Sequence, residues 1–231
     1  MGRTSTRAVV LGAITSGAML VAMAGMFGGC AKKERPLYTV LESADRHALY
    51  ARYPESLKDY SEYLSRRPDD VEARVRYGET LLKAGQAQEA TYEFRLALDT
   101  RPGNQHYAEL LAEAMYQAGS KDELMTFLRH RIEERGNAED HSLLGIYAHK
   151  CGFNDEAEQA LKTAARLDGG KSFVHEFNLS NFYGDINDRV SAIRHLRYAY
   201  AIAPKDPGVL KMMKVYNQVE GSTFGAVPEY N

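Results

Sequence analysis

Residues 71–104 read VEARVRYGETLLKAGQAQEATYEFRLALDTRPGN, and this stretch decides the fold. Apolar residues recur in it at three- and four-residue intervals, which is the period of a helix. Small residues, one large apolar residue and a proline stand at fixed places, namely Gly78, Gly85, Ala90, Phe94, Ala97 and Pro102. Because small residues let two helices approach closely, the stretch predicts a helix-turn-helix unit.

The same pattern recurs three times further along the chain. The second copy has Ala112 and Gly119, the third has Gly145, Gly152, Ala157, Leu161 and Ala164, and the fourth has Ala192, Leu196, Ala199 and Pro204. A unit of this kind cannot bury its apolar face alone, so the copies must stack on one another. We expect the large residues of the four copies to fill the space between consecutive units, at Phe94, Leu128, Leu161 and Leu196.

This spacing resembles the tetratricopeptide (TPR) repeat, which has a period of about 34 residues. The resemblance implies an all-α fold, a right-handed superhelical solenoid of helix-turn-helix repeats. Four repeats are predicted at residues 71–104, 105–137, 138–171 and 173–206. The second is the most divergent, since the family's Ala, Ala and Pro are replaced by Leu124, Arg131 and Gly136.

The repeats are flanked by weaker helical patterns. A degenerate helical pair is predicted at residues 38–70, with helices over Glu42–Tyr53 and Glu55–Arg66. A capping helix is predicted at residues 207–220. Residues 221–231 have little apolar area, so we expect a disordered tail there.

The N-terminal segment carries a separate signal. Arg3 and Arg7 precede twenty-two residues without charge, Ala8 to Gly29, and Cys30 follows directly. This order resembles a bacterial lipoprotein signal peptide. Small residues precede the cysteine, as in that family, whereas Phe27 stands where leucine is usual.

The resemblance implies that residues 1–29 are removed and that Cys30 receives acyl chains such as palmitate. Residues 30–37 would then be a lipidated tether to the membrane. An uncleaved anchor helix is the alternative, because a charge-free run of this length can span a bilayer. Both interpretations place the rest of the chain in the cell envelope, outside the cytoplasmic membrane or on the periplasmic face of the outer membrane.

Composition and motifs argue against several classes of function. The net charge of -2 provides no basic stripe for nucleic acid. No HExxH, GxSxG, phosphate-cradling loop or CxxC is present, so we predict a noncatalytic protein without cofactor. His141, His149 and Cys151 do not supply the four converging ligands of a structural zinc site, and no metal is predicted. His195 is expected on the solvated surface.

In the TPR family, peptides commonly lie in a concave groove, against the second, fifth, ninth and twelfth places of the first helices. The resemblance therefore implies a protein or peptide partner bound by Glu72, Glu79, Glu109, Glu113, Tyr116, Ile146, His149, Phe177 and Asn181. Such a groove is acidic toward its N-terminal half and more apolar toward its C-terminal half. The alternative is that these glutamates are merely solvated on helix surfaces.

These observations lead to an expected function. The chain is similar to membrane-anchored TPR lipoproteins, noncatalytic adaptors that support pilus assembly, outer-membrane biogenesis or peptidoglycan enzymes. An anchored subunit or regulator of an exopolysaccharide or secretion machine is the alternative. An enzyme is a third class, and a cluster of buried ionisable groups would indicate it.

Overall fold

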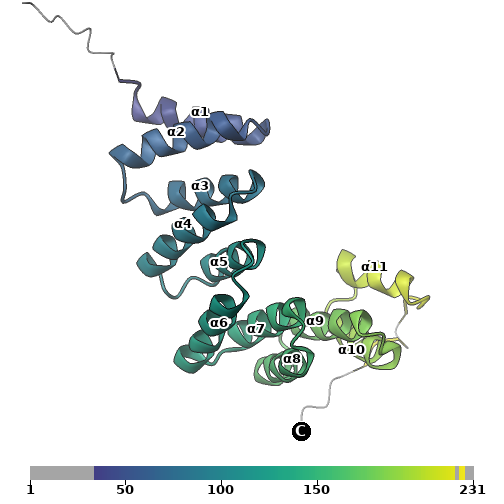
Figure 1. Ribbon diagram of the computed structural model, residues 1–231. Coiled ribbons are helices and arrows are strands. Elements are labelled where there is room, and N and C mark those ends of the chain that lie inside the picture. The colour runs from purple at the N-terminus through teal and green to yellow at the C-terminus, as the bar shows by residue number, and fades with distance from the viewer. Residues whose placement is uncertain (1–33, 222–223, 227–231) are drawn as a thin grey trace, which may run out of the picture. The chain divides into compact units, whose positions relative to one another are not determined.

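The computed structural model describes residues 34–221 and 224–226 of the chain. Within these ranges it contains only α-helices (Figure 1). They are α1 (Leu37–Leu49), α2 (Tyr53–Arg66), α3 (Val71–Lys83), α4 (Ala87–Thr100), α5 (Gln105–Gln117), α6 (Lys121–Arg135), α7 (Ala138–Cys151), α8 (Asn154–Asp168), α9 (Phe173–Asp185), α10 (Arg189–Ile202) and α11 (Pro207–Val215). The predicted signal peptide and Cys30 lie outside the described residues.

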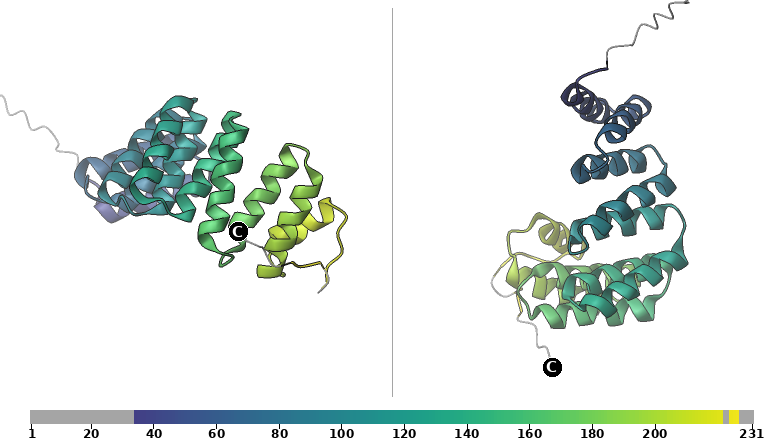
Figure 2. Two further views of the ribbon diagram at one scale, coloured as in Figure 1. Left: turned by 90° about the horizontal axis from the view of Figure 1, so that it is seen from below. Right: turned by 90° about the vertical axis from the view of Figure 1, so that its left-hand side faces the viewer.

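Helices that follow one another in the chain also pack on one another, as two further views show (Figure 2). In addition, α1 contacts α3, α3 contacts α5, α5 contacts α7, and α7 contacts α9. The first helices of consecutive pairs therefore lie side by side and form one face, the first-helix face. This arrangement confirms the predicted all-α fold of stacked helix-turn-helix units.

The first helices begin at the residues that the repeat spacing predicts. Each is preceded by a short polar residue whose side chain accepts a hydrogen bond from the backbone within the first turn. These N-caps are Asp70, Asn104, Asn137 and Ser172, and Asp206 caps α11 in the same way. Because a cap satisfies an otherwise unpaired N–H group, it fixes where the helix starts. A side-chain N-cap thus fixes where the first helix of each repeat begins, from α3 onward.

Two glycines make room for the large apolar residue of their own unit. A Cβ atom added to Gly78 would lie 2.6 Å from the ring of Phe94, and one added to Gly145 would lie 2.5 Å from Leu161. Either approach is shorter than real Cβ contacts allow, so these positions require glycine. Phe94 and Leu161 were expected to fill the space between consecutive units, and each of them also lies over the glycine of its own unit.

Replacement of Phe94 by alanine tests this packing. Phe94 is 0% exposed, so Phe94→Ala leaves a cavity against Gly78. We expect the free energy of unfolding to fall by about 3–5 kcal/mol, measured by denaturant titration with circular dichroism. Tyr92→Ala is the control, because Tyr92 lies on the same helix and is 61% exposed; its effect should stay within about 0.5 kcal/mol. Equal losses in the two variants would contradict the packing.

A buried ion pair joins the divergent second repeat to the third. Arg131 stands where the family has a small residue, and it is 4% exposed. Its Nη2 and Nε atoms lie 2.6 Å and 2.9 Å from Oδ1 of Asp140, whose side chain is fully buried. Arg135 Nε is 3.0 Å from the other carboxylate oxygen. An arginine at this place is therefore possible because α7 supplies a carboxylate to α6.

Removal of the arginine alone should destabilise the protein strongly, since the Asp140 carboxylate then stays buried with one partner fewer. We expect Arg131→Met to lower the free energy of unfolding by about 3 kcal/mol, the lower end for a broken buried pair, because Arg135 remains in contact. The double variant Arg131→Met, Asp140→Leu should recover most of this loss. A single variant as stable as the parent would show that the pair does not hold α6 on α7.

The N-terminal pair follows the same period as the other units. Its first helix runs from Leu37 to Leu49, not over the predicted Glu42–Tyr53. It begins directly after Pro36, and the chain turns away at Ala51, which has a positive φ of 55°. The pair is thus less degenerate in structure than in sequence, because α1 begins 34 residues before α3.

The segment after α11 packs back onto α10. The ring of Phe224 is buried edge-on against Tyr200, with centroids 5.4 Å apart. Arg197 Nε donates a hydrogen bond to the Phe224 carbonyl at 2.8 Å. The expectation of a disordered tail is therefore wrong at Phe224, because α10 supplies the apolar surface that the segment lacks by itself.

Candidate functional site

A partly enclosed groove of about 270 Å³ lies on the first-helix face, between α5, α7 and α9. We call it the first-helix groove. It is lined by Glu109, Glu139, Ser142, Leu143, Ile146, Tyr147, Val174, His175 and Asn178. Each of three consecutive repeats thus contributes residues to it.

The lining of the groove is largely apolar. Leu143 and Ile146 come from α7, and Val174 from α9 is 43% exposed. Asn178 Nδ2 donates a hydrogen bond to Ser142 Oγ at 2.9 Å, which ties α9 to α7 beside these side chains. A bound apolar side chain would remove this surface from water, which is favourable.

Two carboxylates add negative charge to the lining. Glu109 and Glu139 are exposed residues of α5 and α7. No hydrogen bond or ion pair joins either of them to another of the described residues. Their charges are therefore not neutralised within this part of the chain, and they favour a positively charged ligand.

His175 is a further polar residue of the groove lining. It is 5% exposed, and its Nδ1 atom has no hydrogen-bond partner among the described residues. Its Nε2 atom lies 3.9 Å from Asp168 Oδ1. A buried polar atom without a partner costs about 1–3 kcal/mol, so this histidine reduces the stability of the fold beside the groove. Sequence reasoning missed this residue, because no motif singles it out.

The structure brings two of the nine predicted partner-binding residues, Glu109 and Ile146, into the groove. Glu113 and Tyr116 lie next to it on α5, where they contact Tyr147 of the groove lining. These four residues therefore belong to one continuous stretch of the first-helix face.

Other predicted residues are engaged with neighbouring helices. Glu72 accepts hydrogen bonds from Tyr107 Oη and Arg101 Nη1, at 2.9 Å and 2.6 Å, and both interactions lower the pKa of its carboxyl. His149 Nδ1 lies 2.9 Å from Asn154 Oδ1, and its Nε2 lies 3.2 Å from Asp185 Oδ2. A partner that used these groups would first have to displace the present contacts.

The remaining three predicted residues also lie outside the groove. Phe177 packs near Phe173, with ring centroids 6.3 Å apart, and approaches Gly208 at the start of α11. Glu79 and Asn181 are half-buried on α3 and α9. The nine residues are thus spread along the first-helix face, and their contacts with a partner stay a prediction.

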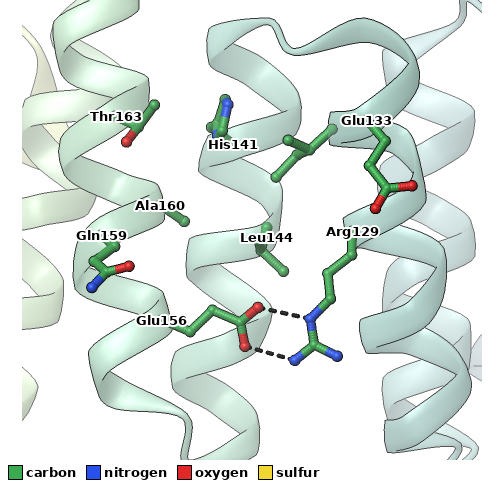
Figure 3. A pocket seen from close by; sticks show the side chains of 9 residues that line it. Arg129, Glu133, His141, Leu144, Glu156, Gln159, Ala160 and Thr163 are labelled. Carbon is green, nitrogen blue, oxygen red and sulfur yellow. Dashed lines mark hydrogen bonds and ion pairs between the residues drawn. The ribbon is translucent and has the colours of Figure 1, made fainter.

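A second cavity, of about 370 Å³, lies between α6, α7 and α8 (Figure 3). Arg129 and Glu156 face each other across it and form two hydrogen bonds of 2.8 Å, so their charges cancel (Figure 3). Burial lowers the pKa of His141, also in its lining, which keeps this imidazole neutral at pH 7. Glu133 is then the only lining carboxylate of this cavity without a partner among the described residues, against two in the groove, so the cavity is a weaker candidate for a cationic ligand.

Buried ionisable groups occur outside both cavities. His195 Nδ1 lies 2.7 Å from Glu176 Oε2, and the His195 ring stacks on Tyr183 with centroids 5.3 Å apart. The expectation that His195 lies on the solvated surface is therefore wrong, because Glu176 of α9 is buried and takes a hydrogen bond from α10. Like Arg131 and its carboxylate, this pair joins helices and lines no cavity described above.

In residues 34–221 and 224–226, no three or more His, Cys, Asp or Glu side chains are grouped so that they could hold a metal ion. None of the helices in the same ranges combines the length and apolar character that crossing a membrane requires.

Comparison with known proteins agrees with this geometry. Residues 50–114 match the tetratricopeptide repeat family. A thermophilic TPR protein of Thermus thermophilus has a similar structure, with 20% sequence identity, a TM-score of 0.56, and coverage of 79% of this chain and 99% of that chain. MamA from Desulfovibrio magneticus RS-1 is 16% identical, with a TM-score of 0.52 and coverage of 74% of this chain and 97% of that chain.

No curated protein matches the sequence. The family match at residues 50–114 and the structural similarity nevertheless agree, and the similarity shows the fold of tetratricopeptide-repeat proteins over the helical part of the chain. The predicted family and its superhelical repeat fold are thereby confirmed. This fold suggests a role in protein interaction.

Proposed function

We propose that the protein is a noncatalytic adaptor, and that its first-helix groove binds a segment of a partner protein that carries basic and apolar side chains. One observation carries the proposal. Glu109 and Glu139, both without ionic partners in the described part of the chain, line the same groove as the apolar side chains of Ile146 and Val174. The first pair favours a cation, and the second pair favours an apolar side chain.

The position of the groove supports a peptide segment as its ligand. The groove measures about 270 Å³ and takes its lining from three consecutive repeats. A side chain bound in it can therefore belong to a segment whose backbone runs on along the first-helix face.

Synthetic peptides of equal length test the proposal. We expect a peptide of lysine and leucine to bind, and we expect peptides of glutamate and leucine or of lysine and serine not to bind, by isothermal titration calorimetry. The double variant Glu109→Lys, Glu139→Lys should weaken binding at least about tenfold, and so should added salt, which screens exposed charges. Glu133→Lys is the control for each single variant, Glu109→Lys and Glu139→Lys, because it changes the net charge equally and Glu133 is exposed and lines the other cavity. Unchanged binding in the double variant would place the site elsewhere.

We further propose that the adaptor is a lipoprotein of the bacterial cell envelope, anchored through acyl chains on Cys30. The uncharged run Ala8–Gly29 before this cysteine supports the proposal. Several acyl chains give stable anchoring, since each buried methylene contributes roughly 0.8 kcal/mol. An anchored adaptor of this kind would hold partners near the membrane during pilus assembly, outer-membrane biogenesis or peptidoglycan synthesis.

The variant Cys30→Ser tests the anchor. We expect it to abolish acylation and to release the protein from membranes, because serine offers no thiol for the thioether. Mass spectrometry of the N-terminus of the purified parent should show loss of residues 1–29 and an added lipid mass on Cys30. An unmodified Cys30 that still follows intact residues 1–29 would refute lipidation and favour an uncleaved anchor helix.

A further inference from the structure

The ammonium group of Lys150 is enclosed by three side chains next to the groove. Its Nζ atom lies 4.5 Å from the ring centroid of Tyr147, 5.1 Å from that of Tyr116, and 3.2 Å from Glu113 Oε2. The two rings are tilted, with centroids 5.9 Å apart. We call Glu113, Tyr116 and Tyr147 the tyrosine box. Aromatic faces and a carboxylate together attract a cation through ring quadrupoles and charge.

The box is held in shape by contacts that do not involve Lys150. Tyr147 Oη donates to Glu113 Oε2 at 2.8 Å, and Gln117 Nε2 donates to Glu113 Oε1 at 2.7 Å. Burial raises the pKa of Glu113, but these hydrogen bonds and the charge of Lys150 outweigh it and hold the pKa below its usual range. The carboxylate is therefore oriented and ionised at neutral pH.

The Lys150 side chain is also able to leave the tyrosine box. Its side chain is 38% exposed, and its ammonium group is held by the three residues of the box. A lysine ammonium sits on a flexible four-carbon stem, so it can leave the box without a change in the backbone. Tyr147 lines both the box and the groove, and Glu109 precedes Glu113 by one helical turn. A peptide in the groove would thus pass the box.

We propose that the tyrosine box is a binding site for the lysine or arginine side chain of a bound partner segment, and that Lys150 occupies it until that side chain displaces it. The inference rests on the proposed function, because the apolar residue of the same segment would lie in the groove. Lys150 then competes with the partner. Its removal should strengthen the binding of a basic segment, whereas a purely structural lysine would leave this binding unchanged.

A small cation tests the box independently of the groove. The full chain carrying Lys150→Gln is titrated with tetramethylammonium chloride, with sodium chloride at equal ionic strength as the reference. We expect saturable shifts of the Tyr116 and Tyr147 ring resonances by NMR, with an affinity about fivefold or more above that of the parent. Lys162→Gln is the matched control, because Lys162 pairs with Glu158 at 2.6 Å outside the box and its loss changes the net charge equally.

Two further variants secure the interpretation. Glu113→Gln in the Lys150→Gln background should remove the shifts, because it removes the charge of the box. Lys150→Met retains an unbranched stem without charge and replaces Lys150→Gln if circular dichroism shows that the latter is unfolded. Absence of shifts at Tyr116 and Tyr147 in a folded variant overturns the inference.

The lysine and leucine peptide separates failure of the box from failure of the groove. We expect Lys150→Gln to bind this peptide about fivefold more tightly than the parent, and Lys162→Gln to bind it as the parent does. Ring shifts with tetramethylammonium but no peptide binding in any variant would refute the groove and leave the box as a cation site. Peptide binding that is equal in parent and Lys150→Gln, without ring shifts, would refute the box and leave the groove.

Discussion

The close approach of two helices within each unit is the constraint on which the other features depend. Where Phe94 covers Gly78, no side chain fits between the helices, and the pair becomes one rigid element. Rigid pairs can stack only through their remaining apolar faces, so the first helices of successive units come to lie side by side. The groove is a product of this stacking. It takes Glu109, Ile146 and Val174 from three different repeats, and no single repeat contains it.

The second repeat shows how far the constraint can be relaxed. Leu124 and Arg131 occupy places where small residues normally allow close packing, and both are buried. The larger side chains are accommodated because Arg131 finds a carboxylate on the following helix, α7. Contact within the repeat is thus partly replaced by contact with the next one. This exchange occurs at α5, α6 and α7, the same part of the chain where the groove and the tyrosine box lie.

The sequence alone predicted the features that depend on local spacing. The starts of α3, α5, α7 and α9 follow from the repeat period, and Gly78 and Gly145 follow from the need for small residues. Contacts between helices could not be predicted in the same way, because they depend on how each helix is rotated about its axis. Lys150 and Glu113 are 37 residues apart, and His195 and Glu176 are 19 apart. A spacing pattern without an alignment does not indicate which of many charged residues meet, and for this reason His195 was assigned to the surface.

The segment around Phe224 affects how the stack ends. At the equivalent place in earlier repeats, Arg95 and Arg129 each pair with a glutamate of the next second helix. In the last of these repeats Arg197 donates instead to the backbone carbonyl of Phe224. The segment therefore occupies the position that a following second helix would otherwise reach. An exposed repeat surface at the end of a stack allows further copies to add head to tail. Such addition produces fibres when the rotation between successive copies does not close a ring. By packing on α10, the segment covers surface on which a further copy could otherwise stack.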